Sequence, residues 1–187
     1  MFGRWFQRPP SLDERVEDRV WTDAAACARG LRAQVEQTLA ARNAVLVLTR
    51  SLIERENLAR DFSHRVLRVG GDRFAAPDLQ QHLRSPAALG LACVGDLRAV
   101  AATTGQTAPL QVHVRGRSTS RSEDRALLDL LRPWAPARVV FHHAIDDALL
   151  QPHTGTLQPL LEKLGWRPDE PIVSQLLTRA IARAQRP

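Results

Sequence analysis

The sequence predicts an α/β domain in which a parallel sheet of about five strands is covered by helices. Apolar runs of strand length recur along the chain, and patterns typical of helices separate them. The runs are apolar at nearly every position, which indicates strands buried on both faces, as in parallel sheets. The expected strands are 44–49, 65–70, 89–95, 110–116 and 137–143.

Helical patterns fill the intervals and the C-terminal part of the chain. Two starts carry a capping box, in which Ser51 precedes Glu54 and Ser120 precedes Glu123. In such a box the hydroxyl accepts an unpaired helix N–H and the carboxylate reaches back to the cap. The expected helices are 22–42, 52–62, 78–84, 96–102 and 122–132, followed by 145–150, 157–164 and 172–185 in the tail.

The 187 residues have the length of one domain, with an irregular segment expected at 1–21 and the folded domain at 22–187. No stretch approaches the roughly 20 apolar residues of a membrane span, and the N-terminal residues contain no secretory signal pattern. Cys27 and Cys93 fit no metal-ligand spacing. We therefore expect a cytoplasmic protein with buried, reduced thiols.

The net charge of +6 comes almost wholly from arginine, because Lys163 is the single lysine. A basic chain favours anionic partners such as nucleic acid or lipid. A solvated arginine surface explains the same charge without a dedicated site. At the N-terminus, aromatic residues stand among arginines and resemble a short interfacial anchor, or a segment packed on the body. These residues are Phe2, Arg4, Trp5, Phe6 and Arg8.

The motifs of nucleotide chemistry are missing. A Walker A loop requires a lysine after a glycine-rich turn, and Lys163 follows no such turn. The chain also lacks a dinucleotide fingerprint, a nucleophile elbow and a zinc-protease motif. We therefore expect no catalytic residues, no cofactor and no ATPase activity of the P-loop type.

Two polar segments allow more than one interpretation. His142, His143, Asp146 and Asp147 follow a strand and suggest metal ligands. Adjacent histidines on a strand point to opposite faces, so at most one can join the carboxylates. The other interpretation is a helix start, where the dipole favours acids, and we expect no metal site. Segment 114–125 either binds phosphate at a helix N-terminus or is a solvated loop.

Four segments together resemble a known family. EKLGWRPDEPIVSQLLTRAIARAQ (162–185) carries the most specific match, and FHHAIDDALL (141–150), VLVLTRSLIERENLARDF (45–62) and VHVRGRSTSRSED (112–124) add weaker ones. Over about residues 35–186 the chain resembles the second motor domain of the SecA preprotein translocase ATPase. The resemblance implies a RecA-like domain of the P-loop NTPase type.

The chain departs from this family at its nucleotide contacts. Where the family carries an arginine-rich loop that reaches the nucleotide, this chain has a leucine-rich run in which we expect at least two leucines to be buried. The run contains Leu127, Leu128, Leu130 and Leu131. Of a second nucleotide-contacting segment, the doubtful remnants are Gly95, Asp96 and Arg98. The first motor domain, which carries the P-loop in SecA, has no counterpart here.

The resemblance implies a non-catalytic accessory protein in protein or peptide export. Its partner would be a translocase, an export ATPase or a secreted substrate, with possible peripheral contact at the inner face of the membrane. A helicase-like nucleic-acid-binding module is the alternative. A small phosphotransfer or hydrolytic enzyme using residues 142–147 is a third hypothesis.

The last helix has an apolar stripe that something must cover. The stripe consists of Ile172, Val173, Leu176, Leu177, Ala180, Ile181 and Ala184. In SecA the helix continues toward other domains, so the resemblance implies a helix buried at its start and open at its end. The candidate partner-binding residues at that end are Arg179, Ile181, Arg183 and Arg186.

Overall fold

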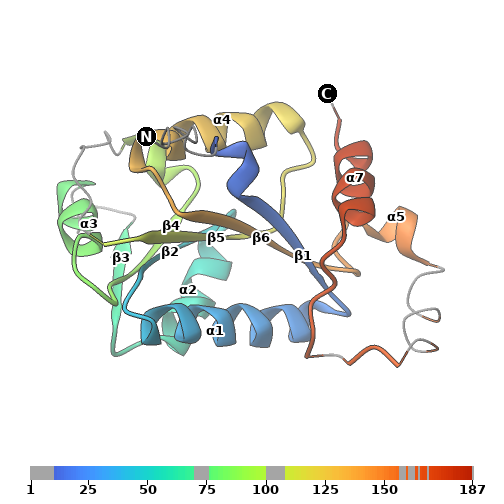
Figure 1. Cartoon of the computed structure of the whole chain (residues 1–187), viewed down its shortest axis with the longest axis horizontal. Helices are drawn as coiled ribbons and strands as arrows, with labels where there is room; N and C mark the ends of the chain where they lie inside the picture. Colours follow the sequence, from blue (N-terminus) through green and yellow to red (C-terminus); the bar gives the residue numbers. More distant parts are fainter. Residues whose placement is uncertain are drawn as a thin grey trace, which may run out of the picture.

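The computed structural model shows an α/β fold with parallel strands (Figure 1). It describes residues 11–69, 76–99, 108–155, 159, 163, 165–167 and 169–186. Within these residues the sheet has six strands in the order β1-β6-β5-β2-β4-β3. The strands are β1 Val16–Trp21, β2 Ala44–Thr49, β3 Val66–Val69, β4 Leu89–Cys93, β5 Leu110–Arg115 and β6 Arg138–Ala144.

All five expected strands are present, and every pairing in the sheet is parallel. Strand β1 is a correction, because residues 16–21 fall in the segment expected to be irregular. Its sequence VEDRVW has three consecutive charged residues, Glu17, Asp18 and Arg19, between apolar ends. The charged side chains of this strand have partners within the protein, which explains how it can join the sheet at an edge.

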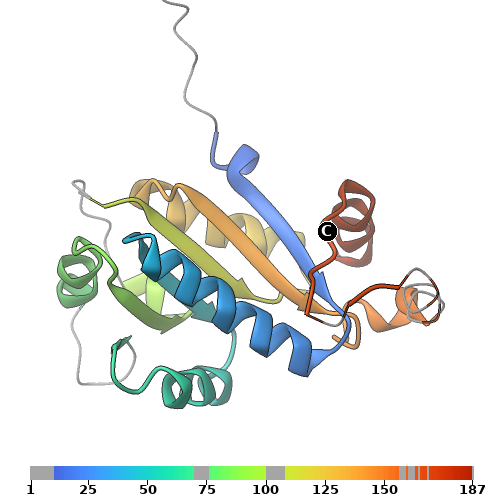
Figure 2. The same ribbon diagram turned by 60° about the horizontal axis from the view of Figure 1, so that its bottom comes forward.

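Helices cover both faces of the sheet (Figures 1 and 2). The longer ones are α1 Ala24–Ala40, α2 Leu52–Asp61, α3 Ala76–Leu83, α4 Arg121–Leu131 and α7 Gln175–Ala184. Short helices are η1 Asp13–Arg15, η2 Asp96–Ala99, η3 Arg132–Trp134 and α5 Gln151–Thr154. No helix in these described parts of the chain is long and apolar enough to cross a membrane.

Helices α1 and α2 pack on one face of the sheet. Leu31, Val35 and Leu39 recur along one side of α1 and meet Leu58 and Phe62 of α2 over strands β2 and β4. The first helical turn of α2 is capped as expected, because Ser51 Oγ accepts the N–H of Glu54 at 3.2 Å.

Close contact between α1 and strand β1 depends on Gly30. A Cβ atom at this position would lie 1.9 Å from Cη2 of Trp21, inside the indole ring. The glycine therefore lets the helix lie directly on a buried tryptophan at the sheet edge.

Helices α3 and α4 pack on the opposite face. Leu79 and Leu83 of α3 join Leu127 and Leu131 of α4 in one core cluster with Trp134. The expected burial of the leucine-rich run is confirmed, because Leu127 is 1% and Leu131 0% exposed.

The expected capping box at the start of α4 is wrong. The side chain of Ser120 makes no cap hydrogen bond. The Ser118 hydroxyl accepts the N–H of Ser120 at 3.1 Å instead and donates to the Glu123 carboxylate. Ser118 and Glu123 therefore hold the residue that precedes the helix, and Ser118 does not cap the helix N–H groups.

The tail differs from expectation at residues 145–150, which form turns rather than a helix. Most of the helix expected at 157–164 lies outside the described residues. The chain then returns to β1, where Val20 and Ile172 exchange backbone hydrogen bonds of 3.1 and 2.7 Å. Helix α7 follows and stands beside this edge of the sheet (Figure 1).

The expectation that α7 is buried at its start and open at its end is wrong. Val173, just before the helix, is 56% exposed, whereas Ile181 near its end is 0% exposed. Ile181 lies in a cluster with Val20, Ile145 and Leu150, and therefore cannot belong to an open docking surface. Arg179, Arg183 and Arg186 of the candidate partner-binding set are exposed, and their role stays a prediction.

We predict that Leu127→Ala lowers the free energy of unfolding by about 2–5 kcal/mol, because it leaves a cavity in a packed core. Leu130→Ala, at a half-buried position of the same helix, should cost clearly less. Urea denaturation of both variants measures the difference. Equal losses would contradict the assignment of Leu127 to the core.

Candidate functional site: the carboxyl edge of the sheet

Ligands of open parallel sheets bind outside the carboxyl ends of the strands, where successive connections leave toward opposite faces. In this sheet that point lies between the neighbouring strands β2 and β5. Strand β2 continues into α2 on one face, and β5 continues into α4 on the other. The loops 50–51 and 116–120 therefore border the expected ligand crevice.

An ion pair bridges these two loops. The Arg50 guanidinium donates from Nη2 to Asp124 Oδ1 at 2.5 Å and from Nε to the Gly116 carbonyl oxygen at 3.2 Å. Asp124 is buried, and Arg50 is largely covered. Protein side chains thus occupy the space at the strand ends where this kind of fold places a ligand.

Asp124 is the centre of a wider network. Its carboxylate accepts the Ser118 N–H at 3.0 Å and the Gln185 side-chain amide at 2.5 Å. The same amide nitrogen of Gln185 donates to the Ser118 carbonyl at 2.8 Å. The residue after α7 is therefore tied to the loop that follows β5, far away in sequence.

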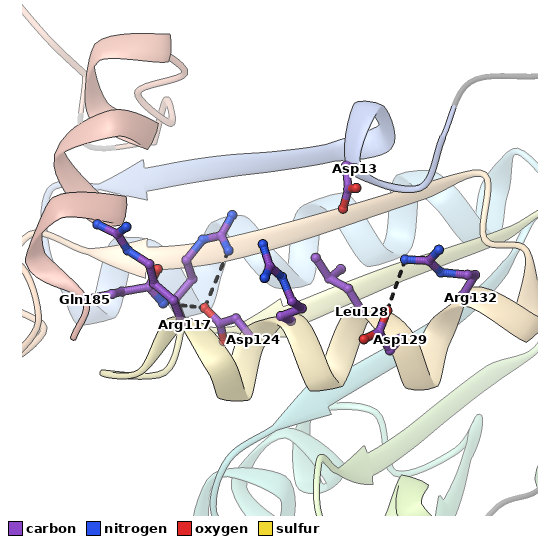
Figure 3. Close-up of a pocket in the computed structure, with 9 residues that line it drawn as sticks. Asp13, Arg117, Asp124, Leu128, Asp129, Arg132 and Gln185 are labelled. Atoms are coloured by element: carbon purple, nitrogen blue, oxygen red, sulfur yellow. Dashed lines mark hydrogen bonds and ion pairs between the residues drawn. The ribbon is translucent and has the colours of Figure 1, made fainter. Parts of the chain in front are cut away.

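Arg117 extends the network to strand β1. It binds Asp18 through two hydrogen bonds of 2.7 and 3.0 Å, and its guanidinium lies 4.1 Å from the ring centroid of Phe141. It also reaches Asp124 at 3.5 Å (Figure 3). His143 Nε2 donates to Asp18 at 3.1 Å, since a carboxylate can only accept.

The charge states of Asp18 and Arg117 follow from their surroundings. Burial raises the pKa of the Asp18 carboxyl, but hydrogen bonds from His143 and Arg117 outweigh burial and lower that pKa to about 2. Burial lowers the pKa of Arg117, and its bonds to Asp18 raise it above the usual value. The pair is therefore fully charged at neutral pH, and each charge is balanced inside the protein.

The N-terminus of α4 is covered by the end of the chain. The Arg121 N–H donates to the Arg186 carbonyl at 2.9 Å, and the Arg186 N–H donates to the Thr119 carbonyl at 2.7 Å. Arg121 Nε donates to the Ala182 carbonyl at 2.6 Å. These contacts use groups that a phosphate would need, so the structure favours the loop interpretation of segment 114–125.

The polar residues at the end of β6 and in the turn after it contact different elements. Asp147 binds Arg115 through contacts of 3.1 and 3.3 Å and accepts the Ala144 N–H at 2.8 Å. Asp146 lies 3.4 Å from the N–H of Ala24, at the start of α1. His143 pairs with Asp18 on the other side of the sheet. The expected carboxylates and histidines are thus not brought together.

His142 lies on the α1 side of the sheet in a chain of buried rings. Trp21 Nε1 donates to His142 Nδ1 at 3.4 Å, and His142 Nε2 is 3.0 Å from His113 Nδ1. Indole only donates, so neutral His142 carries its proton on Nε2 and donates it to His113. His113 Nε2 is then an N–H, and it is buried without a partner in the described part of the chain.

Burial dominates the titration of these rings. It lowers the pKa of His113 to about 3 and that of His142 well below the usual value. Nearby positive charges, including Arg19, lower both further. Both rings are neutral in the folded protein at physiological pH.

The proposed remnants of a nucleotide contact follow β4. Asp96 accepts the Cys93 N–H at 3.1 Å and pairs with Arg55 at 3.5 Å. Gly95 is exposed, and Arg98 lies in η2, with its side chain outside the described residues. Asp96 therefore closes a turn, and the origin of these residues as remnants of a nucleotide-contacting segment stays a prediction.

Both cysteines are buried and free, as expected. Burial raises the pKa of the Cys27 thiol to about 12. A protonated, covered thiol is a poor nucleophile. Cys27 is therefore part of the packing between α1 and the sheet, where it lies beside Trp21 and Ala144.

The described residues form a cleft of about 300 Å³ on the outer side of this network. It lies between α4, η1 and the end of α7, with Leu128 and Arg132 on the α4 side and Asp13 across from them (Figure 3). Its lining consists of Asp13, Arg117, Arg121, Asp124, Arg125, Leu128, Asp129, Arg132 and Gln185.

Comparison with known proteins gives little beyond the fold. No protein-family model and no curated protein matches the sequence. Among solved structures, the chain is similar to one described as the C-terminal part of the Fun30 ATPase domain, with 11% identity and a TM-score of 0.43. The match covers 83% of this chain and 51% of that one, so this chain spans about half its length. The resemblance to SecA therefore stays a prediction.

Sequence reasoning missed three residues of the network, which are Asp18, Arg50 and Gln185. Asp18 had a usable signal, because VEDRVW has the length of a strand and ends on residues of high β-propensity, Val16 and Trp21. Arg50 follows a predicted strand directly, at the edge where ligands bind. Nothing in the sequence indicates that Gln185 meets Asp124.

We predict that stability falls as the pH is lowered from about 6.5. The pKa values of His113 and His142 are lower in the folded than in the unfolded chain, so the unfolded chain binds more protons in this range. Each histidine contributes up to about 1.4 kcal/mol per pH unit. Asp18, with its pKa of about 2, adds a further loss between about pH 4 and 2.

Urea unfolding of the His113→Phe variant at pH 7, 6, 5 and 4 tests the first part. The variant should show a shallower decline than the wild-type protein, because one of the two buried titrating rings is gone. His64→Phe is the matched control at an exposed position and should keep the wild-type slope. An unchanged slope for His113→Phe would refute the assignment.

Deletion of residues 180–187 should destabilise the protein by several kcal/mol. It removes the buried Ile181 and leaves Asp124 without the Gln185 amide. Thermal and urea unfolding measure the loss. Arg183→Ala in the full chain should change little, since Arg183 is exposed. A truncated chain as stable as the full one would show that the contacts of Ile181 and Gln185 are dispensable.

Proposed function

We propose that this chain is a non-catalytic α/β domain that acts by binding a protein partner. One observation carries the proposal: the crevice between β2 and β5, where such folds hold their ligand, is filled by Arg50 and Asp124. The Gln185 amide and the backbone of Arg186 cover the adjoining start of α4. The missing P-loop supports the same conclusion.

We further propose that the partner belongs to a protein-export machine. The support is the sequence resemblance to SecA, strongest over residues 162–185. The partner is a translocase, an export ATPase or a secreted substrate, and the chain works in the cytoplasm or at the inner face of the membrane. In this role the domain contributes a surface, while the partner supplies nucleotide chemistry.

Nucleic-acid binding is the second candidate, and the net charge of +6 favours it. The described aromatic rings weigh against it. Trp21, Trp134 and Phe141 are buried, and Trp166 Nε1 donates to the Glu170 carbonyl. Single-stranded binding relies on exposed rings that stack on bases.

We predict that the purified protein neither binds nor hydrolyses Mg-ATP, because it lacks a lysine and a hydroxyl placed to hold phosphates and magnesium. Isothermal titration calorimetry and a phosphate-release assay measure the two properties. ATP hydrolysis that remains after purification and is lost in the Asp96→Ala variant would overturn the proposal. It would show that the residues after β4 are functional.

Biolayer interferometry with the immobilised chain tests the partner class. The probes are purified SecA, an unfolded preprotein, and single- and double-stranded oligonucleotides, each over a salt titration. Binding to SecA or the preprotein supports the export role. Binding to oligonucleotides alone, with a steep salt dependence, would support the nucleic-acid alternative instead.

A further inference from the structure

The outer face of α4 presents a row of side chains to the cleft of about 300 Å³. Arg121, Arg125 and Leu128 follow one another at intervals of four and three residues, which places them on one face of α4, and Arg132 continues the row just after the helix ends. The row is about 16 Å long at the helical rise per residue. We call it the arginine row.

The arginines that line the cleft differ in what they already bind. Arg117 is committed to Asp18 below the cleft. Arg132 pairs with Asp129 at 3.0 Å, but both side chains are more than half exposed, and such pairs contribute little. Arg125 is exposed and has no ion pair among the residues that the structure describes. The cleft therefore offers positive charge that the folded chain does not use internally.

The end of α7 enlarges this positive surface. Arg121 donates to the Ala182 carbonyl, and the backbone of Arg186 pairs with Thr119 and Arg121. Arg183 and Arg186 have exposed side chains in this same region. The arginine row and the last residues of α7 thus form one continuous part of the surface.

We propose that this cleft binds an extended acidic segment of the partner protein. Arg121 and Arg125 are about 6 Å apart along the helix. Alternate side chains of an extended chain repeat at about 6.6 Å on one side, so two acidic residues separated by one position match both arginines. Leu128 lies about 4.5 Å further along the helix and offers an apolar contact to the segment beyond its two acids. Arginine suits carboxylates because its planar guanidinium donates two parallel hydrogen bonds to the two carboxylate oxygens.

The carboxylates of the cleft favour a peptide over nucleic acid. Asp13 and Asp129 line the same space as the arginine row. They repel a continuous phosphate backbone but can accept N–H groups from the main chain of a peptide. Discrete acids separated by uncharged residues fit this mixture of charges, whereas a uniform polyanion does not.

Fluorescence anisotropy with a labelled Asp-Ala-Asp-Ala-Leu peptide tests the proposal. The full chain should bind it, and the Arg125→Glu variant should bind about tenfold more weakly or worse, as expected for loss of a charge-assisted contact and gain of a repulsion. Arg65→Glu makes the same charge change at an exposed position outside the cleft and should leave binding unchanged. Circular dichroism checks that both variants fold.

Two results would overturn the proposal. One is equal binding of a peptide in which asparagine replaces both aspartates. This result would show that the cleft does not recognise carboxylates. The other is tighter binding of an oligonucleotide that Arg125→Glu abolishes, which would make the cleft a nucleic-acid site.

This inference rests on the proposed protein-binding function but fails separately from it. If the wild-type chain captures SecA or a preprotein and Arg125→Glu captures it equally well, the cleft is the wrong surface and the function stands. If the acidic peptide binds through Arg125 while neither export protein is captured, the cleft is correct and the export role is wrong.

Discussion

The paired charges of Asp18 and Arg117 are the interaction on which the rest of the fold depends. Asp18 is buried in an edge strand, and an unpaired carboxylate there would cost several kcal/mol. Two hydrogen bonds from Arg117 and one from His143 balance it. Strand β1 can therefore join the sheet despite its charges. The same guanidinium lies over Phe141, so one side chain connects β1, β6 and the loop after β5.

The network also explains why the chain returns to the sheet after residue 165. Helix α7 brings Ile181 onto the apolar residues at the end of β1, and it brings Gln185 onto Asp124. The first contact is hydrophobic and is compatible with many registers of the helix. The second requires one register, because the amide must meet Asp124 Oδ2 and the Ser118 carbonyl together. Apolar burial thus supplies affinity for the body, and the polar contacts fix the position.

The parts of the fold that the sequence predicts are those whose cause is local. Strand β2 is buried at all its positions and apolar at all but the last, Thr49, and its bounds match the prediction. Strand β1 was missed because the groups that balance Asp18 lie 99 and 125 residues away. The stripe on α7 predicts that something covers the helix but does not say which end, since periodicity carries no information about the partner. The network at the carboxyl edge could not be predicted either, because its partners lie far apart in the sequence.

The arginines around α4 differ in whether they have a buried carboxylate partner. Arg117 and Arg50, toward the sheet, take the carboxylates of Asp18 and Asp124. Those acids are then no longer available to balance the arginines that point outward. The same distribution of charges therefore closes the crevice with ion pairs and leaves the outer surface positive. A domain that fills its own ligand crevice with ion pairs keeps its unbalanced charge outside, where it can attract an acidic partner over the distance that salt screening permits.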